Sequence, residues 1–259
     1  RTSYYQENWG FCMSHNQLRD LPEDHYEVFI DSTLDKGYMT FGEYFIPGET
    51  SDEVLISTHI CHPSLANDNL SGIAVAAFLA RELSQKRHRH SYRFLFIPGT
   101  IGAITWLSLN ERRTKYIKYG LVASLLGRPG AFTYKKSRQG NTDIDHVVQQ
   151  VLKLRHVPHE VRAFTPYGYD ERQFCSPGFN LPVGCLSRAS WQEYPEYHTS
   201  GDNMDVITAE ALKESLELYK TILQMLECNR RYLNVNPKCE PQLGKRGLYH
   251  QVGGDHSGK

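Results

Sequence analysis

The chain has 259 residues, and its 29 Lys and Arg balance its 29 Asp and Glu, so the formal net charge is zero. Apolar residues make up 40% and charged residues 22%, a balance typical of globular proteins that argues against extensive disorder. Zero net charge disfavours the global basic surface that nucleic-acid-binding proteins use, and no apolar run approaches the roughly 20 residues of a membrane span. We therefore expect neither a nucleic acid nor a membrane as a partner.

The six cysteines are scattered, without a CxxC pair. This spacing argues against a zinc ribbon and a dense disulfide framework, and it favours a reducing compartment, so we expect a cytoplasmic protein. The chain begins at Arg1 with neither an initiator Met nor a signal peptide, which leads us to expect the core of a longer protein. We leave open whether the chain forms a homo-oligomer.

In chain order, residues 1–50 are expected to form a β-rich segment that continues into the main domain, with alternating strands at 26–30 and 38–45. Residues 51–230 then alternate between short β-branched runs and helical patterns. The expected strands are 54–60, 92–97, 121–126, 160–164 and 181–186, and the expected helices are 73–85, 103–110, 144–154 and 208–228. This alternation predicts an α/β fold with a mostly parallel central sheet flanked by helices.

The residues after the last predicted helix carry no apolar stripe. Pro237, Pro241 and several glycines interrupt the tail. We expect 231–259 to be an extended C-terminal linker, and 253–258 to be disordered.

Histidines and carboxylates recur at the predicted carboxyl ends of the strands, where open α/β sheets bind ligands. His59, His62 and Asp68 follow the first buried strand, and two later segments, 169–172 and 194–203, carry more. Imidazole and carboxylate ligands together suit Zn²⁺. Each residue also has a plain structural interpretation: a loop histidine is often only hydrogen-bonded, and Asp68 could simply cap the helix that follows it.

The segment His62–Gly72, which contains Asp68-Asn69-Leu70-Ser71-Gly72, resembles the Asp-Asn-x-Ser-Gly turn of the bacterial (Vibrio and Streptomyces) type of zinc aminopeptidases, peptidase clan MH. The segment 194–203, with His198 and Asp202, resembles the last metal-binding histidine of that clan and the turn after it. Residues 3–249 are more closely similar to a group of bacterial aminopeptidase-like proteins, through motifs such as Ile60–Ser64 and Gly168–Arg172. The resemblance implies the three-layer α/β sandwich of zinc exopeptidases and phosphorylases.

The sequence departs from the clan at three places. His59-Ile60-Cys61 stands in the register of the usual His-x-Asp of the first strand, Gly99-Thr100 replaces the paired Glu after the second strand, and the third-strand Asp is absent. A standard two-zinc site therefore cannot be built from the matching positions, and we expect one zinc ion rather than two.

Among the matching positions, His62, Asp68 and His198 remain as the expected metal ligands. A fourth ligand must come from elsewhere, and we expect Glu171 in that role with Asp170 as the catalytic base. The reverse assignment of the two carboxylates is open, and so is the choice between His59 and His62.

Arg138, Arg172 and Tyr197 are expected to bind the substrate, by holding a carboxylate or the developing oxyanion. The expected reaction is metal-assisted hydrolysis of an amide, most simply removal of the N-terminal residue of a peptide, or cleavage of a related small amide. The alternative is a catalytically impaired domain that keeps the fold and binds a metal or ligand. A nucleophilic Cys61–His62 pair is disfavoured, because adjacent residues on an extended loop rarely point at one another.

Overall fold

We describe the protein from a computed structural model, which covers residues 7–33, 35–188 and 194–248. The chain divides into two compact units, residues 1–38 and 39–259. The first contains one short helix among its described residues, α1 (His15–Asp20), which begins with a capping box between Ser14 and Gln17. The strand predicted at 26–30 is wrong: these residues are exposed and pair with no other described strand. Alternation alone cannot form a strand without a neighbouring strand to bond.

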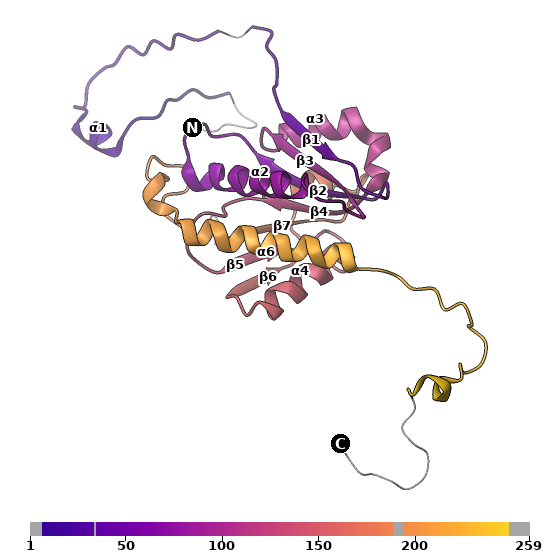
Figure 1. Ribbon diagram of the computed structural model, residues 1–259. Coiled ribbons are helices and arrows are strands. Elements are labelled where there is room, and N and C mark those ends of the chain that lie inside the picture. The colour runs from indigo at the N-terminus through magenta and orange to yellow at the C-terminus, as the bar shows by residue number, and fades with distance from the viewer. Residues whose placement is uncertain (1–6, 34, 189–193, 249–259) are drawn as a thin grey trace. The chain divides into compact units, whose positions relative to one another are not determined.

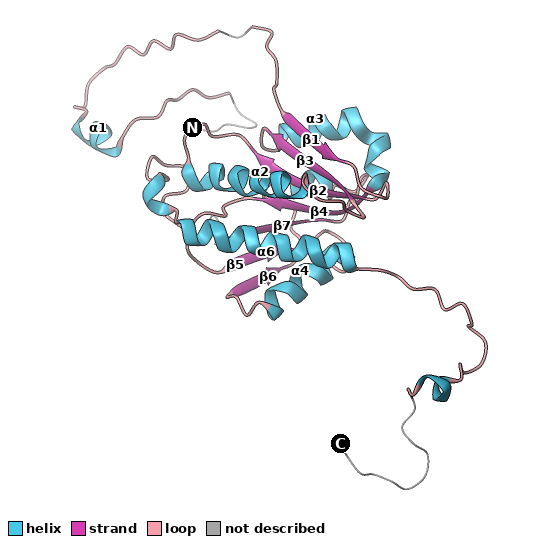
Figure 2. Ribbon diagram, in the orientation of Figure 1, coloured by secondary structure: helices cyan, strands magenta, loops and turns pink. Residues whose placement is uncertain are grey.

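The second unit is built on a seven-stranded sheet of order β1-β3-β2-β4-β7-β5-β6, shown in Figures 1 and 2. The strands are β1 (Gly42–Ile46), β2 (Glu53–His59), β3 (Ser91–Ile97), β4 (Ile117–Ala123), β5 (Phe132–Lys135), β6 (His159–Arg162) and β7 (Val183–Arg188). The pairings β1–β3 and β5–β7 are antiparallel and the other four are parallel. The prediction of a mostly parallel sheet is confirmed.

Helices cover both faces of this sheet. The helices are α2 (Gly72–Leu83), α3 (Ile101–Asn110), α4 (Asp143–Leu154), α5 (Glu171–Phe174) and α6 (Ala209–Cys228). Buried apolar side chains of α2, α4 and α6 share one core with the sheet, and those of α3 and α5 share a second core. Figure 1 shows α2, α4 and α6 together on one side of the sheet. This is the three-layer α/β sandwich that the sequence predicts.

Local differences from the predictions have physical causes. The strand predicted at 121–126 lies at 117–123, because Leu125 adopts a left-handed conformation (φ 56°) that ends the strand and turns the chain. The prediction missed β5, whose four residues carry too short an alternating pattern, and α5, a single helical turn. The helix predicted at 208–228 is α6, and Thr208 caps it by accepting a hydrogen bond from the backbone N–H of Ala211.

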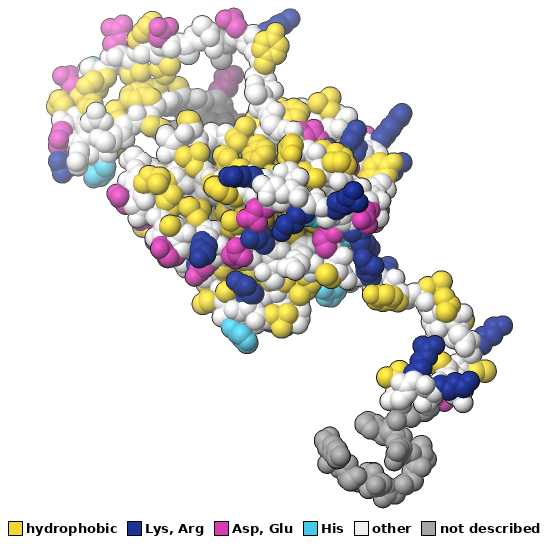
Figure 3. Space-filling view, viewed as in Figure 1, with side chains coloured by type: hydrophobic (Ala, Val, Ile, Leu, Met, Phe, Trp, Pro, Cys, Tyr) yellow, Lys and Arg dark blue, Asp and Glu magenta, His cyan; other side chains and the backbone are white. Residues whose placement is uncertain are grey.

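Described residues after α6 contain one short 3₁₀ turn, Leu243–Arg246, and are almost all exposed. The expected disorder at 253–258 lies outside the described residues, so the linker assignment stays a prediction. Among the described helices, none is both long and apolar enough to cross a bilayer. On the face shown in Figure 3, basic and acidic side chains are interspersed rather than grouped by sign.

Candidate functional site

The loop that follows β2 is held in place by its own asparagine side chains. The Asn69 side-chain amide donates to Thr58 Oγ1 at 2.7 Å and to the carbonyl of Ala123 at 3.1 Å, and its oxygen accepts the backbone N–H of Leu125 at 3.0 Å. These bonds join the ends of β2 and β4 to the loop. Asp68, one residue earlier, is consequently fixed in a fully buried position.

A second loop is tied to the first by Asp202. Its carboxylate accepts the backbone N–H of Asn67 at 2.7 Å and that of Asp68 at 3.0 Å. Asp202 is itself almost fully buried, so little water competes for these bonds. Because His198 lies only four residues before Asp202, this anchor brings its imidazole to Asp68.

Three imidazoles surround the Asp68 carboxylate. Nε2 of His59 lies 2.6 Å from Oδ1, whereas Nε2 of His198 lies 2.9 Å and Nδ1 of His62 3.6 Å from Oδ2. His59 is buried and His198 is exposed. The sequence prediction grouped His62, Asp68 and His198 and left His59 open, and the structure brings all four together.

The cluster has the donors that a metal ion needs. Ligand atoms of His59, His62 and Asp68 all lie within 4.8 Å of one another. Nδ1 of His59 and Nδ1 of His62 are buried without a hydrogen-bond partner among the described residues, which is costly unless something else satisfies them. Neutral imidazole and ionised carboxylate are ligand types that Zn²⁺ prefers. These residues therefore fit a zinc ion.

The ionisation of the cluster also suits a cation. Burial opposes the charge of Asp68, but the hydrogen bond from His59 and the neighbouring His62 and His198 outweigh it and lower the pKa of Asp68 below its ordinary value. Burial lowers the pKa of His62 despite Asp68 nearby, and His198 and His59 lower it further. A carboxylate and a neutral imidazole at neutral pH are both metal-binding forms.

Asp170 lies beside this cluster at the start of α5. Its Oδ1 accepts the backbone N–H of Thr100 at 2.6 Å, and its Oδ2 is buried without a partner in the part of the chain that the structure describes. Burial raises the pKa of Asp170 to about 6, although Thr100 and the nearby His59 oppose this rise. Through this bond the Asp170 carboxylate lies next to Gly99-Thr100, the segment after β3 that has no carboxylate of its own.

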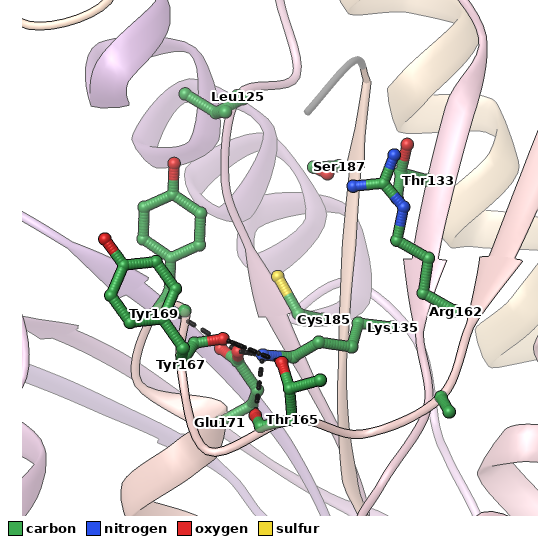
Figure 4. A pocket seen from close by; sticks show the side chains of 12 residues that line it. Leu125, Thr133, Lys135, Arg162, Thr165, Tyr167, Tyr169, Glu171, Cys185 and Ser187 are labelled. Carbon is green, nitrogen blue, oxygen red and sulfur yellow. Dashed lines mark hydrogen bonds and ion pairs between the residues drawn. The ribbon is translucent and has the colours of Figure 1, made fainter. Parts of the chain in front are cut away.

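Glu171 points elsewhere. Its Oε1 forms an ion pair with Lys135 and accepts the backbone N–H of Tyr169 at 3.2 Å. It lines a cavity of about 210 Å³ over one face of β5 and β7, next to the end of β6 and the segment 163–169, shown in Figure 4. The structure does not bring Glu171 into the group of His59, His62 and Asp68, so the expectation that it supplies a metal ligand gains no support here.

The three expected substrate-binding residues differ in position. Arg172 is partly buried and close enough to Asp170 to lower the pKa of Asp170, and Arg172 Nε is buried with no hydrogen-bond partner among the described residues. The ring of Tyr197 stacks on that of His198 with centroids 3.9 Å apart, and burial raises the pKa of Tyr197 to about 12. Arg138 is exposed, and within the described chain no recorded contact joins its side chain to the cluster.

Cys61 is not activated as a nucleophile. Its Sγ accepts the backbone N–H of Gly99 at 2.6 Å. Burial raises the pKa of the Cys61 thiol in spite of this bond, and Asp170 and Asp68 raise it further. A raised pKa keeps the thiol protonated, which is the opposite of what nucleophilic catalysis requires. The disfavoured Cys61–His62 pair is therefore unsupported on chemical grounds as well.

Sequence reasoning missed two residues that shape the site. Tyr169 stacks on His59 with ring centroids 5.1 Å apart and also lines the cavity, and Lys135 neutralises Glu171. Lys135 is in β5, the strand that the prediction missed, so no sequence signal placed it at this edge. Tyr169 directly precedes Asp170 in a segment already singled out, and its aromatic character was the available signal.

The family assignment rests on most of the chain. A sequence family described as "Domain of unknown function (DUF4910)" matches residues 16–229. The chain belongs to the DUF4910 family. A second family, described as "winged helix-turn-helix", matches residues 230–259, after the DUF4910 region.

Two comparisons with Clostridium acetobutylicum proteins extend beyond the DUF4910 region. A protein named "Putative polysaccharide biosynthesis protein with aminopeptidase-like domain" is 51% identical over 253 residues, which is 98% of this chain and 58% of that protein. A crystal structure of a "putative peptidase" is 50% identical, with a TM-score of 0.84 over 95% of this chain and 58% of the other. This chain thus spans little more than half the length of either protein.

More distant structures share the fold. A zinc aminopeptidase from Bacillus subtilis is 19% identical, with a TM-score of 0.59 over 72% of this chain and 49% of the other. At this identity the likeness establishes the fold alone. The DUF4910 chain thus has an aminopeptidase-like α/β fold, as the sequence resemblance implies.

Proposed function

We propose that this protein is a zinc-dependent amide hydrolase of the aminopeptidase-like kind, which removes N-terminal residues from peptides or cleaves a related small amide. One observation carries the proposal: three imidazoles converge on the buried Asp68 carboxylate at the carboxyl edge of parallel strands. This edge is where open α/β sheets bind ligands. The aminopeptidase-like fold adds support.

His59, His62, Asp68 and His198 would hold one Zn²⁺. When bound, zinc supplies a Lewis acid that polarises a carbonyl and makes water more acidic. Asp202 would hold Asp68 and His198 close together, because its carboxylate accepts hydrogen bonds from the backbone of the first loop. The stack of Tyr169 on His59 would fix the plane of that imidazole.

Asp170 would act as the general base. It is next to the cluster, and a pKa of about 6 leaves it mostly ionised at neutral pH but close enough to neutrality to exchange a proton efficiently. Its Oδ2 has no other partner in the described chain, so it is available to take the proton of the attacking water and return it to the leaving amine. Thr100 would hold the other oxygen still.

Arg172 and Tyr197 would orient the substrate, since both lie close to the cluster. The role proposed for Arg138 rests on the sequence alone, and so does the assignment of one ion rather than two. The cysteines Cys61, Cys175, Cys185, Cys228 and Cys239 form no disulfide, which supports the further proposal of a reducing, cytoplasmic environment.

The test combines metal content with turnover. The purified chain is analysed for metals and assayed on a panel of aminoacyl anilides and acylated amino sugars, with added zinc and with a chelator. We expect bound zinc and chelator-sensitive hydrolysis, both lost in His198→Ala and retained in the remote, exposed His146→Ala. Bound zinc without turnover would favour the alternative of a catalytically impaired binding domain, and no metal in any preparation would refute the ligand assignment.

A further inference from the structure

The cavity that contains Glu171 has its own chemistry, apart from the histidine cluster. It lies over one face of β5 and β7, next to the end of β6 and the segment 163–169 (Figure 4). At about 210 Å³ it is smaller than the roughly 300–1,000 Å³ of pockets that hold whole ligands. It therefore has room for one group of a larger molecule rather than for an extended peptide.

One residue forms a wall between the cavity and the cluster. The ring of Tyr169 lines the cavity, and it stacks on the imidazole of His59 with an interplanar angle of 13°. Leu125, which also lines the cavity, is hydrogen-bonded through its backbone to Asn69 in the loop that carries Asp68. A group held in the cavity is thus one aromatic ring away from an amide held at the cluster.

The charges of the cavity are already compensated. Lys135 Nζ pairs with Glu171 and donates to the carbonyl oxygens of Tyr167 at 2.7 Å and Thr165 at 3.3 Å, which uses its three donors. Arg162, on the opposite wall, forms an ion pair with Glu160 at 2.6 Å. A ligand with a full charge would therefore find no complementary charge in excess.

One acceptor in this neutral environment is left unsatisfied. Glu171 is fully buried, and its Oε2 has no hydrogen-bond partner in the described chain although its Oε1 has two. An unpaired buried carboxylate oxygen is costly, so it favours a ligand that donates a hydrogen bond. A hydroxyl group donates without adding charge. Thr133 and Tyr167 add further polar and aromatic lining.

Gly168 keeps the carboxylate in this position. It has a φ of 154°, a conformation that side chains rarely adopt, and a Cβ there would collide with Glu171 Oε1 and Lys135 Nζ. The loop can lie directly over the ion pair only because residue 168 is glycine. Glu171 Oε1 is thereby covered, and Oε2, itself buried, is the carboxylate oxygen without a hydrogen-bond partner in the described chain.

We propose that this cavity is a substrate subsite for a hydroxyl-bearing group, with Glu171 Oε2 as its hydrogen-bond acceptor. This inference rests on the proposed hydrolase function, because it makes the cavity the place where part of the amide substrate binds. The hydroxyl could belong to a sugar ring or to a hydroxylated amino-acid side chain. Apolar groups of equal size are disfavoured, because they leave the buried acceptor unpaired.

The experiment measures binding of matched small probes to the full chain by NMR titration. L-Serinamide is compared with 2-aminobutyramide, in which a methyl replaces the hydroxyl, and glucosamine is compared with tetrahydropyran-3-amine, which keeps the ring oxygen and the amine without the hydroxyls. We expect at least one hydroxylated probe to bind about tenfold or more tightly than its apolar partner. Which pair shows the preference identifies the source of the hydroxyl.

Two variants test the assigned acceptor. The double variant Glu171→Leu with Lys135→Met removes both charges at once, so no unpaired charge stays buried, and Ala163→Trp fills the cavity from an exposed position. Both should abolish the hydroxyl preference, and His146→Ala on α4 should keep it. Equal affinity for the matched probes, or a preference that survives both variants, would overturn the subsite.

The subsite proposal and the hydrolase proposal can be refuted independently of one another. A hydroxyl preference that persists in His198→Ala, with metal and turnover lost, would support the subsite as distinct from the metal ligands. A hydroxyl preference in a chain that holds no metal and hydrolyses no amide would refute the hydrolase and keep the binding site. Turnover that is equal for hydroxylated and apolar amides would refute the subsite and keep the hydrolase.

Discussion

Asp170 and Glu171 are neighbours in the sequence, yet they serve two different regions on either side of Tyr169. Asp170 faces the histidine cluster, where His59 and Arg172 oppose its charge only in part, and burial raises its pKa to about 6. Glu171 faces the cavity, where Lys135 forms an ion pair with it. Two adjacent buried carboxylates thus differ in charge balance and in available chemistry. The comparison teaches that burial alone does not decide what a carboxylate can do, because the groups around it set how far its charge is compensated.

The largest effect should follow a change at the centre of the histidine cluster. Asp68→Asn removes the negative charge on which His59, His62 and His198 converge, so we expect loss of bound zinc and of turnover by about 10³-fold or more. Elemental analysis and a hydrolysis assay measure both. The exposed Glu210→Gln on α6 is the control, and a variant that keeps full zinc content would disprove the central role of Asp68.

The next largest effect should come from Asp170, and it tests whether this residue is the general base. Asp170→Asn keeps the shape of the side chain but cannot accept a proton, so turnover should fall about 10²–10⁴-fold while zinc content is unchanged. Parallel metal analysis separates the two roles that the sequence left open. If zinc is lost together with turnover, Asp170 is a ligand rather than the base.

The same variant should be more stable than the parent when metal is removed. The rise in the pKa of Asp170 from 3.8 to about 6 corresponds to a cost of about 3 kcal/mol at neutral pH, because the folded state disfavours the ionised form. The stabilising contribution of the protonated carboxyl is full below pH 3.8 and is lost as the pH rises through about 6. Denaturant unfolding in a chelator should show the gain of Asp170→Asn above pH 6 and little difference near pH 4. A gain that does not depend on pH would contradict this cause.

A smaller effect is expected from the residue that joins the two loops. Asp202→Ala removes the acceptor of two backbone N–H groups next to Asp68, so the zinc affinity should fall about 10–100-fold. Competition with a chromogenic chelator measures this affinity. Asp202→Asn retains one acceptor oxygen and should lose less, and equal losses in both variants would indicate a role for the charge itself.

The smallest effect should follow the loss of His62, and His59 is the histidine to compare it with. His62 is about one-third exposed and 3.6 Å from Asp68, whereas His59 is buried and 2.6 Å away. His62→Ala should therefore reduce zinc affinity less than tenfold, and His59→Ala by about 100-fold or more. The reverse order would restore the assignment of His62 as the principal ligand.

Much of the fold could be predicted from the sequence. The buried strands β2 and β3 and the helices α2, α4 and α6 have long periodic patterns, and their predicted bounds differ from those observed by only a few residues. β5 could not be predicted, because its four residues depend on pairing with β6 and β7. The strand predicted at 26–30 is the opposite error, because its residues have an alternating pattern but no neighbouring strand, in the described part of the chain, to pair with.

The residues of the candidate site also fall into two groups, those that local motifs predict and those that depend on the tertiary structure. Asp68 and His198 lie in motifs whose local spacing and resemblance pointed to them, and the structure brings them to ion-pair distance. The assignment of Glu171 depended on a non-local fact, namely which side of Tyr169 each carboxylate faces. The position of Lys135 decides this, and it is fixed by strand pairing rather than by any pattern near residue 171.

The bond from Asp202 to the backbone of Asn67 joins residues 135 positions apart in the chain. Closing so long a loop costs entropy that is repaid only when the intervening strands and helices have packed. His59, His62 and Asp68 are close in sequence, whereas His198 should join them only when these elements have packed. An ion that binds all four residues therefore favours the native state over partly folded ones. The apparent melting temperature of the protein should consequently rise with the free zinc concentration.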